Sequence, residues 1–149
     1  ILAGGHEVAL HTYDHGLWYP FRSPTKIRDD LRRGVAALVR AGAPEPRWFR
    51  PPNGLITPSI AQEVARAGLR VAGWTIRPWD GVRTAPEVVV RRVTRALRGG
   101  DVVLLHDARS LYGGAAVPPA VVALPAILDA LDARRLRAVT LSEFESLSR

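Results

Sequence analysis

The run Val102-Val103-Leu104-Leu105-His106-Asp107 indicates the fold class of this chain. Four consecutive apolar residues without polar alternation are typical of a parallel strand that is buried on both faces. A histidine and an aspartate follow at the carboxyl end of the run, where parallel α/β folds place their functional residues. The run therefore predicts a parallel sheet with a site along its carboxyl edge.

Short apolar segments alternate with helical stretches on both sides of this run. We expect strands at 7–11, 48–50, 70–76, 102–105 and 137–140. Helices are expected at 24–41, 58–67, 84–97 and 118–133 and from 142 onward. Their starting signals are Ser23, Thr57, a Thr84/Glu87 capping box and Ser142. This order predicts a parallel α/β architecture, either a barrel or a doubly wound sheet.

Composition narrows the class of protein. The chain has 149 residues, 47% of them hydrophobic, as expected for one globular domain. It has no cysteine, which excludes disulfides and thiolate metal sites, and no apolar run approaches a membrane span. The net charge of +7 comes almost wholly from scattered arginines, as in Arg28-Asp29-Asp30, and favours a solvated basic surface over nucleic-acid binding. No Gly-x-Gly-x-x-Gly segment supports nucleotide binding.

The segment His11-Thr12-Tyr13-Asp14-His15 is a candidate metal site. It places two of the four histidines four residues apart, after the apolar residues Val8-Ala9-Leu10. Two imidazoles at this spacing can converge on one ion, although such a pair taken alone is more often an unliganded surface pair. The metal interpretation gains support because Arg50, Asp80 and His106 also fall at predicted carboxyl ends of strands.

Four segments together resemble a known family. They are Gly5-His6-Glu7 with His11 to His15, Arg50-Pro51-Pro52-Asn53-Gly54, Leu104-Leu105-His106-Asp107 and Val139-Thr140-Leu141-Ser142-Glu143. In this order they resemble the motifs of the polysaccharide deacetylases, the NodB-homology domains of carbohydrate esterase family 4. The resemblance covers residues 1–149. It implies a distorted (β/α)7 barrel of parallel strands and a metal-dependent hydrolase that removes N- or O-linked acetyl groups from sugars.

The resemblance also implies roles for the residues that would perform this chemistry. His11 and His15 would bind a divalent metal, commonly zinc, with cobalt or manganese as alternatives, and Thr12 would brace the turn between them. His106 would be the general acid, and Arg50 and Asp80 would complete the catalytic group, with Asp80 tuning His106.

Three further residues would contact the carbohydrate. The backbone N–H of Asn53 would help to hold the oxyanion. Leu104 would line the pocket for the acetyl methyl group. Trp79 lies in a suitable loop for substrate contact, although a role in the core or at the rim fits this residue as well.

Two departures from the family pattern affect these expectations. Arg77-Pro78-Trp79-Asp80-Gly81 stands where the family has Asp-x-x-Asp-Trp, so Asp80 matches only the second aspartate. The family's Thr-Phe-Asp-Asp-Gly motif, which supplies the base and a third metal ligand, is absent, and the chain contains no methionine. We therefore expect strands 3–7 of the barrel to be present and the first strands missing, about 60 residues at roughly 30 per βα unit.

The leading hypothesis is thus that this chain is the C-terminal portion of a carbohydrate deacetylase domain. We expect it to lack the base motif and to have little turnover of its own. The alternative is an inactive barrel fragment that binds a glycan or a protein partner. Three properties stay open: the acetylated sugar that is recognised, the oligomeric state and the compartment. For the compartment, many family members act outside the cytoplasm.

Overall fold

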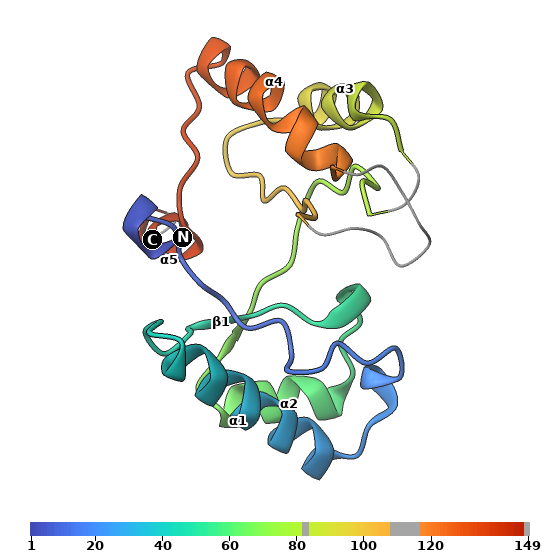
Figure 1. The fold of residues 1–149 in the computed structure, drawn as a ribbon, viewed down its shortest axis with the longest axis vertical. Helices are drawn as coiled ribbons and strands as arrows, with labels where there is room; N and C mark the ends of the chain where they lie inside the picture. Colours follow the sequence, from blue (N-terminus) through green and yellow to red (C-terminus); the bar gives the residue numbers. More distant parts are fainter. Residues whose placement is uncertain (82–83, 108–116, 148–149) are drawn as a thin grey trace. The chain divides into compact units, whose positions relative to one another are not determined.

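The computed structural model describes residues 1–81, 84–107 and 117–147 and divides the chain into two compact parts (Figure 1). The first part comprises Ile1–Gly73 together with Thr140–Arg149, and the second comprises Trp74–Val139. Each part buries its own cluster of hydrophobic side chains. Over the described ranges, the structure contains no helix with the length and apolar character that a membrane crossing requires.

Two helices, α1 (Pro24–Arg40) and α2 (Pro58–Arg66), pack against each other in the first part (Figure 1). Both begin as predicted, with proline at the first helical position. The Ser23 hydroxyl accepts from the N–H of Lys26 at 3.4 Å, and the Thr57 hydroxyl accepts from the N–H of Ile60 at 3.3 Å. Their apolar faces contribute to a core of Leu10, Tyr19, Ile27, Leu31, Phe49, Ile60, Val64 and Leu69.

A buried carboxylate joins these helices. Glu63 of α2 is only 1% exposed, and it accepts hydrogen bonds from Arg28 Nε at 2.8 Å and Arg28 Nη2 at 3.1 Å. Arg66 donates a further bond at 2.5 Å. The Arg28 bond is the main cause of the lowered pKa of Glu63. A carboxylate buried in this way needs both partners, because an unpaired buried charge is strongly destabilising.

The strands of the first part are short and parallel. β1 (Trp48–Phe49) pairs with β2 (Arg70–Val71), with Trp48 opposite Arg70 and Phe49 opposite Val71. Leu10 forms an isolated parallel bridge to Phe49. In this bridge, the Leu10 N–H donates to the Trp48 carbonyl and the Arg50 N–H donates to the Leu10 carbonyl, each at 2.9 Å. Phe49 therefore lies at the centre of three paired backbone segments.

The C-terminal helix α5 (Leu141–Leu147) completes the first part. Thr140, and not Ser142, caps this helix, because the Thr140 hydroxyl accepts the Glu143 N–H at 3.1 Å. The predicted Ser142 cap is wrong because that side chain has a tertiary partner instead. Ser142 donates through its N–H (3.0 Å) and its hydroxyl (2.5 Å) to the Glu7 carboxylate.

The second part contains α3 (Pro86–Ala96) and α4 (Pro119–Ala133), which pack side by side (Figure 1). Ile76 and Val103 form a parallel bridge beside them. The predicted Thr84/Glu87 capping box is wrong, since α3 has no side-chain cap and the Thr84 hydroxyl donates to the Trp79 carbonyl at 2.8 Å. The core consists of Ile76, Val89, Val93, Leu97, Ala123 and Ile127.

The prediction of five strands is wrong for the described residues, which form two strands and two isolated bridges. The segments at 7–11 and 102–105 pair only through Leu10 and Val103, and 137–140 forms no strand. A segment becomes a full parallel strand only where a neighbour continues along its edge. Every pairing is parallel, as predicted, and the chain is a mixed, mostly helical α/β structure.

The buried ring of Phe49 allows the first core to be tested. Phe49→Ala should lower the free energy of unfolding by about 3–5 kcal/mol, because it leaves a cavity where a fully buried ring was. Phe21→Ala is the matched control, since that ring is 76% exposed, and should change stability by less than about 0.5 kcal/mol. Urea denaturation followed by circular dichroism measures both. Equal effects of the two substitutions would contradict the assigned core.

Candidate active site

The segment His11–His15, the histidine turn, begins where the parallel bridge at Leu10 ends. Leu10 is 2% exposed, so the start of the turn is anchored in the core. Thr12 (φ 67°) and His15 (φ 48°) both adopt left-handed backbone conformations, which are uncommon for residues other than glycine. The Thr12 hydroxyl accepts from the His15 N–H at 2.9 Å, which confirms that Thr12 braces the turn.

The two imidazoles of this turn converge. Their ring centroids lie 4.8 Å apart with 71° between the ring planes. Two imidazoles on one tetrahedral zinc have centroids about 5 Å apart, given Zn–N distances of about 2.0–2.1 Å. His11 Nδ1 lies 2.6 Å from the Arg50 carbonyl oxygen, so Nδ1 is the donor, and in the neutral ring Nε2 carries the lone pair. A carbonyl bound to the other ring nitrogen is typical of a metal-binding histidine, so the pair fits two ligands of a divalent metal.

The described residues contain no group of three or more histidine, aspartate or glutamate side chains that could hold a metal ion. Asp14, inside the turn, is held elsewhere. It accepts from Arg22 Nη2 at 2.8 Å and from the Gly16 N–H at 3.0 Å, and the Arg22 bond lowers the pKa of Asp14. Catalytic zinc usually has three protein ligands, whereas the histidine turn offers two imidazoles.

Asp30 of α1 supports the histidine turn and was missed by the sequence analysis. Its carboxylate is 4% exposed and accepts the Tyr13 N–H at 3.1 Å, and Arg22 Nη1 lies 3.5 Å away. Burial is the main cause of the raised pKa of Asp30. The interpretation of this aspartate as part of a solvated surface is therefore wrong. The sequence did indicate this burial, because helical spacing places Asp30 on the same face of α1 as the buried residues Ile27, Leu31 and Gly34.

The Arg50–Gly54 loop follows β1 and contacts the histidine turn through its backbone. The Arg50 carbonyl holds His11, while the guanidinium donates to the carbonyls of Ala72 (3.2 Å) and Gly73 (3.1 Å). Burial lowers the pKa of Arg50 from its ordinary value. Asn53 is exposed and adopts a left-handed conformation (φ 57°, ψ 5°), which asparagine tolerates well. Arg50 thus holds the His11 ring through its carbonyl and the backbone of Ala72 and Gly73 through its guanidinium.

The second part contains the other candidate pair, Asp80 and His106. The Asp80 carboxylate is buried and binds His106 twice. Oδ2 accepts from the His106 N–H at 2.6 Å, and Oδ1 lies 3.1 Å from Nδ1 of the ring. The imidazole is 45% exposed, so Asp80 fixes the ring from the protein side and leaves its outer edge accessible. The structure brings together these two residues, which lie 26 positions apart in the sequence.

Two further candidate residues lie near this pair in the chain. Leu104 is buried, and its N–H donates to the Ile76 carbonyl at 3.0 Å. Trp79 is 51% exposed with a left-handed backbone (φ 63°), and the Arg77 guanidinium lies 4.0 Å from the centroid of its ring. Arg77, which replaces the family's first aspartate, therefore makes a cation–π contact with Trp79 in this structure.

Comparisons with known proteins agree with these motifs. The pattern that describes the polysaccharide deacetylase family matches residues 1–72. A peptidoglycan-N-acetylglucosamine deacetylase of Bacillus cereus is 33% identical over 145 residues, covering 96% of this chain and 65% of its own length. A chitooligosaccharide deacetylase of Bradyrhizobium is 36% identical over 112 residues, covering 72% of this chain and 49% of its own length.

A solved structure is also similar. A family 4 acetyl xylan esterase from Clostridium thermocellum, in complex with a cobalt ion, superposes with a TM-score of 0.85 at 28% identity and covers 98% of this chain and 67% of that one. The chain belongs to the polysaccharide deacetylase family, carbohydrate esterase family 4. It spans about two thirds of the length of the Bacillus relative and about half of the Bradyrhizobium relative.

The support that Asp30 gives to the histidine turn can be measured by amide hydrogen exchange. Asp30→Ala removes the acceptor of the Tyr13 N–H, and exchange of this amide should accelerate at least tenfold, corresponding to a charge-assisted hydrogen bond of about 1.5–3 kcal/mol. Asp29→Ala is the control, because that side chain is 56% exposed. Unchanged Tyr13 exchange in Asp30→Ala would show that the carboxylate does not hold the turn.

Proposed function

We propose that this chain is part of a metal-dependent hydrolase that removes N- or O-linked acetyl groups from a polysaccharide or an acylated sugar. The convergence of His11 and His15 carries this proposal. Their ring separation of 4.8 Å and the bond from His11 to the Arg50 carbonyl suit two imidazoles that share one ion. Membership of the polysaccharide deacetylase family supports the same reaction class.

His11 and His15 would hold the divalent ion, for which zinc is our first expectation and cobalt or manganese are alternatives. When bound, the ion would act as a Lewis acid toward the acyl carbonyl. The Arg50 carbonyl would keep His11 in the required tautomer, and the Thr12 hydroxyl would keep the backbone of His15 in its left-handed conformation. Both ligands are therefore oriented before an ion arrives.

His106 would act as the general acid. As water adds to the acetyl carbon and the C–N or C–O bond breaks, His106 would give its proton to the departing amine or alkoxide, and acetate would be released. Because Asp80 accepts from Nδ1 of the ring, Nε2 is the nitrogen that would deliver this proton. Asp80 would also stabilise the positive charge of the imidazolium before transfer.

Three residues are proposed to contact the substrate. The exposed backbone at Asn53 would contribute an N–H toward the oxyanion, and its left-handed conformation would fix the direction of that N–H. The buried side chain of Leu104 would limit the space for the acetyl methyl group. The half-exposed ring of Trp79 would offer an apolar face to a sugar.

A second candidate function is a catalytically inactive domain that binds a glycan or a protein partner. It is favoured by one observation: within the described ranges, no third histidine or carboxylate completes the metal ligands. Sequencing the DNA upstream of the Ile1 codon separates the two functions. An in-frame segment resembling Thr-Phe-Asp-Asp-Gly would support the deacetylase, whereas an initiator codon directly ahead of Ile1 would support the inactive domain.

Metal binding tests the histidine turn directly. Titration of this chain with Co²⁺, followed by visible absorption, should show binding that weakens at least tenfold in His11→Ala and in His15→Ala, because each loses one of two imidazole ligands. His6→Ala is the matched control and should bind as the unmodified chain does. If all three variants bound Co²⁺ equally, the two histidines would not be metal ligands.

The general acid is tested by turnover. In the protein as it is encoded, including any coding sequence upstream of Ile1, His106→Gln should lower kcat for an acetylated oligosaccharide by roughly 10²–10⁴-fold. Its Co²⁺ affinity should stay unchanged, because His106 is not a proposed ligand. A variant with unaltered kcat would remove His106 from the mechanism.

A further inference from the structure

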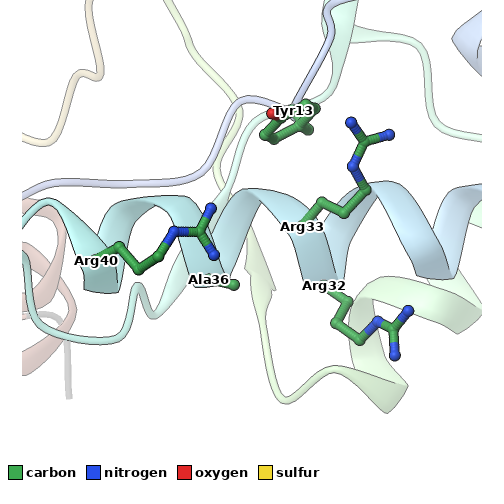
Figure 2. Close-up of a pocket in the computed structure, with 5 residues that line it drawn as sticks. All are labelled: Tyr13, Arg32, Arg33, Ala36 and Arg40. Atoms are coloured by element: carbon green, nitrogen blue, oxygen red, sulfur yellow. The ribbon is translucent and has the colours of Figure 1, made fainter.

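The outer surface of α1 contains a pocket that the proposed chemistry does not use. We call it the basic pocket; its cavity has a volume of about 310 Å³ and is lined by Tyr13, Arg32, Arg33, Ala36 and Arg40 (Figure 2). Figure 2 shows Tyr13 above the helix with Arg33 reaching toward it. Four of the five lining residues come from α1, and Tyr13 comes from the histidine turn.

The spacing of these residues explains the hollow. Arg32, Ala36 and Arg40 lie four residues apart, so they form one row along the helix, and the small side chain of Ala36 leaves room between two long ones. Arg32 and Arg40 are eight positions apart, about 12 Å along the helix axis, and the neutral Ala36 lies between them. The row therefore places a positive charge on each side of the cavity.

The charge of the basic pocket is poorly compensated. Among the described residues, neither Arg33 nor Arg40 has a carboxylate within 4 Å, whereas Arg22 and Arg28 each bind a buried carboxylate. Arg32 lies 3.6 Å from the exposed Asp29 only. The Arg33 guanidinium lies 4.1 Å from the centroid of the Tyr13 ring, which holds it by a cation–π contact and leaves its N–H groups for another partner.

The basic pocket is also physically joined to the histidine turn. Tyr13 is two residues from His11 and two from His15, and its N–H is held by the buried Asp30. The wall of the pocket is thereby fixed relative to the proposed metal ligands. Tyr13 is therefore part of the histidine turn and of the wall of the basic pocket.

We propose that the basic pocket binds an anionic group, a carboxylate or a phosphate, carried by the glycan on which the proposed deacetylase acts. Guanidinium groups bind both oxyanions through charge-assisted, often bidentate hydrogen bonds. The substrate class is then an acidic glycan, with its charged sugar in the basic pocket. This inference rests on the proposed function for the identity of the ligand as a glycan.

Binding to two defined oligosaccharides tests this inference with the whole 149-residue chain. The first is a neutral N-acetylglucosamine hexamer, and the second is a strand of the same length in which every other sugar carries a lactyl carboxylate. Calorimetry at low salt should give about tenfold tighter binding of the acidic strand, as expected for charge-assisted contacts. Arg33→Gln/Arg40→Gln should abolish this preference, and glutamine maintains the helix at exposed positions.

Arg91→Gln/Arg95→Gln is the matched control, because it removes the same charge from exposed positions of α3. It should keep the tenfold preference for the acidic strand. If both double variants lost the preference for the acidic strand equally, net charge would explain this preference. The assignment of anion binding to the basic pocket would then be overturned. Complete displacement of the acidic strand by equimolar inorganic phosphate would overturn the glycan assignment, because a free oxyanion would then suffice.

The same titrations separate this inference from the proposed function. If the chain binds both strands equally, the basic pocket fails while the glycan substrate stands. If it binds neither strand, the glycan substrate fails together with the pocket. The acidic preference should persist in His11→Ala, because the anionic group does not contact the metal ligands.

Discussion

The pairing of Leu10 with the backbone on either side of Phe49 is the constraint on which the first part of the structure depends. Two hydrogen bonds of 2.9 Å fix the chain at the point where His11 follows on one segment and Arg50 on the other. The bond from His11 to the Arg50 carbonyl then follows from this register. A slip of one residue would turn alternate side chains to the opposite face and separate the two motifs.

The histidine turn and the Asp80/His106 pair each have their own buried carboxylate. Asp30 holds the histidine turn through the Tyr13 N–H, and Asp80 holds His106 through its backbone and its ring. Both carboxylates are 4% exposed. Hydrogen bonds to a buried carboxylate are strong because little water competes with them, so each group of residues can be organised within its own part of the chain.

The sequence predicted those features that local chemistry determines. Ser23 and Thr57 cap their helices because the capped N–H groups lie within three residues. The histidine pair was singled out by its spacing together with the family motifs. The strands were overestimated because their lengths depend on neighbours elsewhere in the chain. The burial of Asp30 was indicated only by its helical spacing from Ile27 and Leu31. The contact of Ser142 with Glu7 is a tertiary effect that no local pattern indicated. The pairing of Asp80 with His106 was expected only through the family motif.

The bond between Glu7 and Ser142 joins segments that lie 135 positions apart, so the first part is not continuous in sequence. During synthesis, residues 1–73 must therefore wait for α5, which is made only after the whole second part. Until then, the Trp48 indole N–H, which donates to Ser142 at 3.1 Å, and the Glu7 carboxylate lack these partners. The intervening 66 residues of the second part can fold in the meantime, so the first part is completed after the second although its synthesis begins earlier.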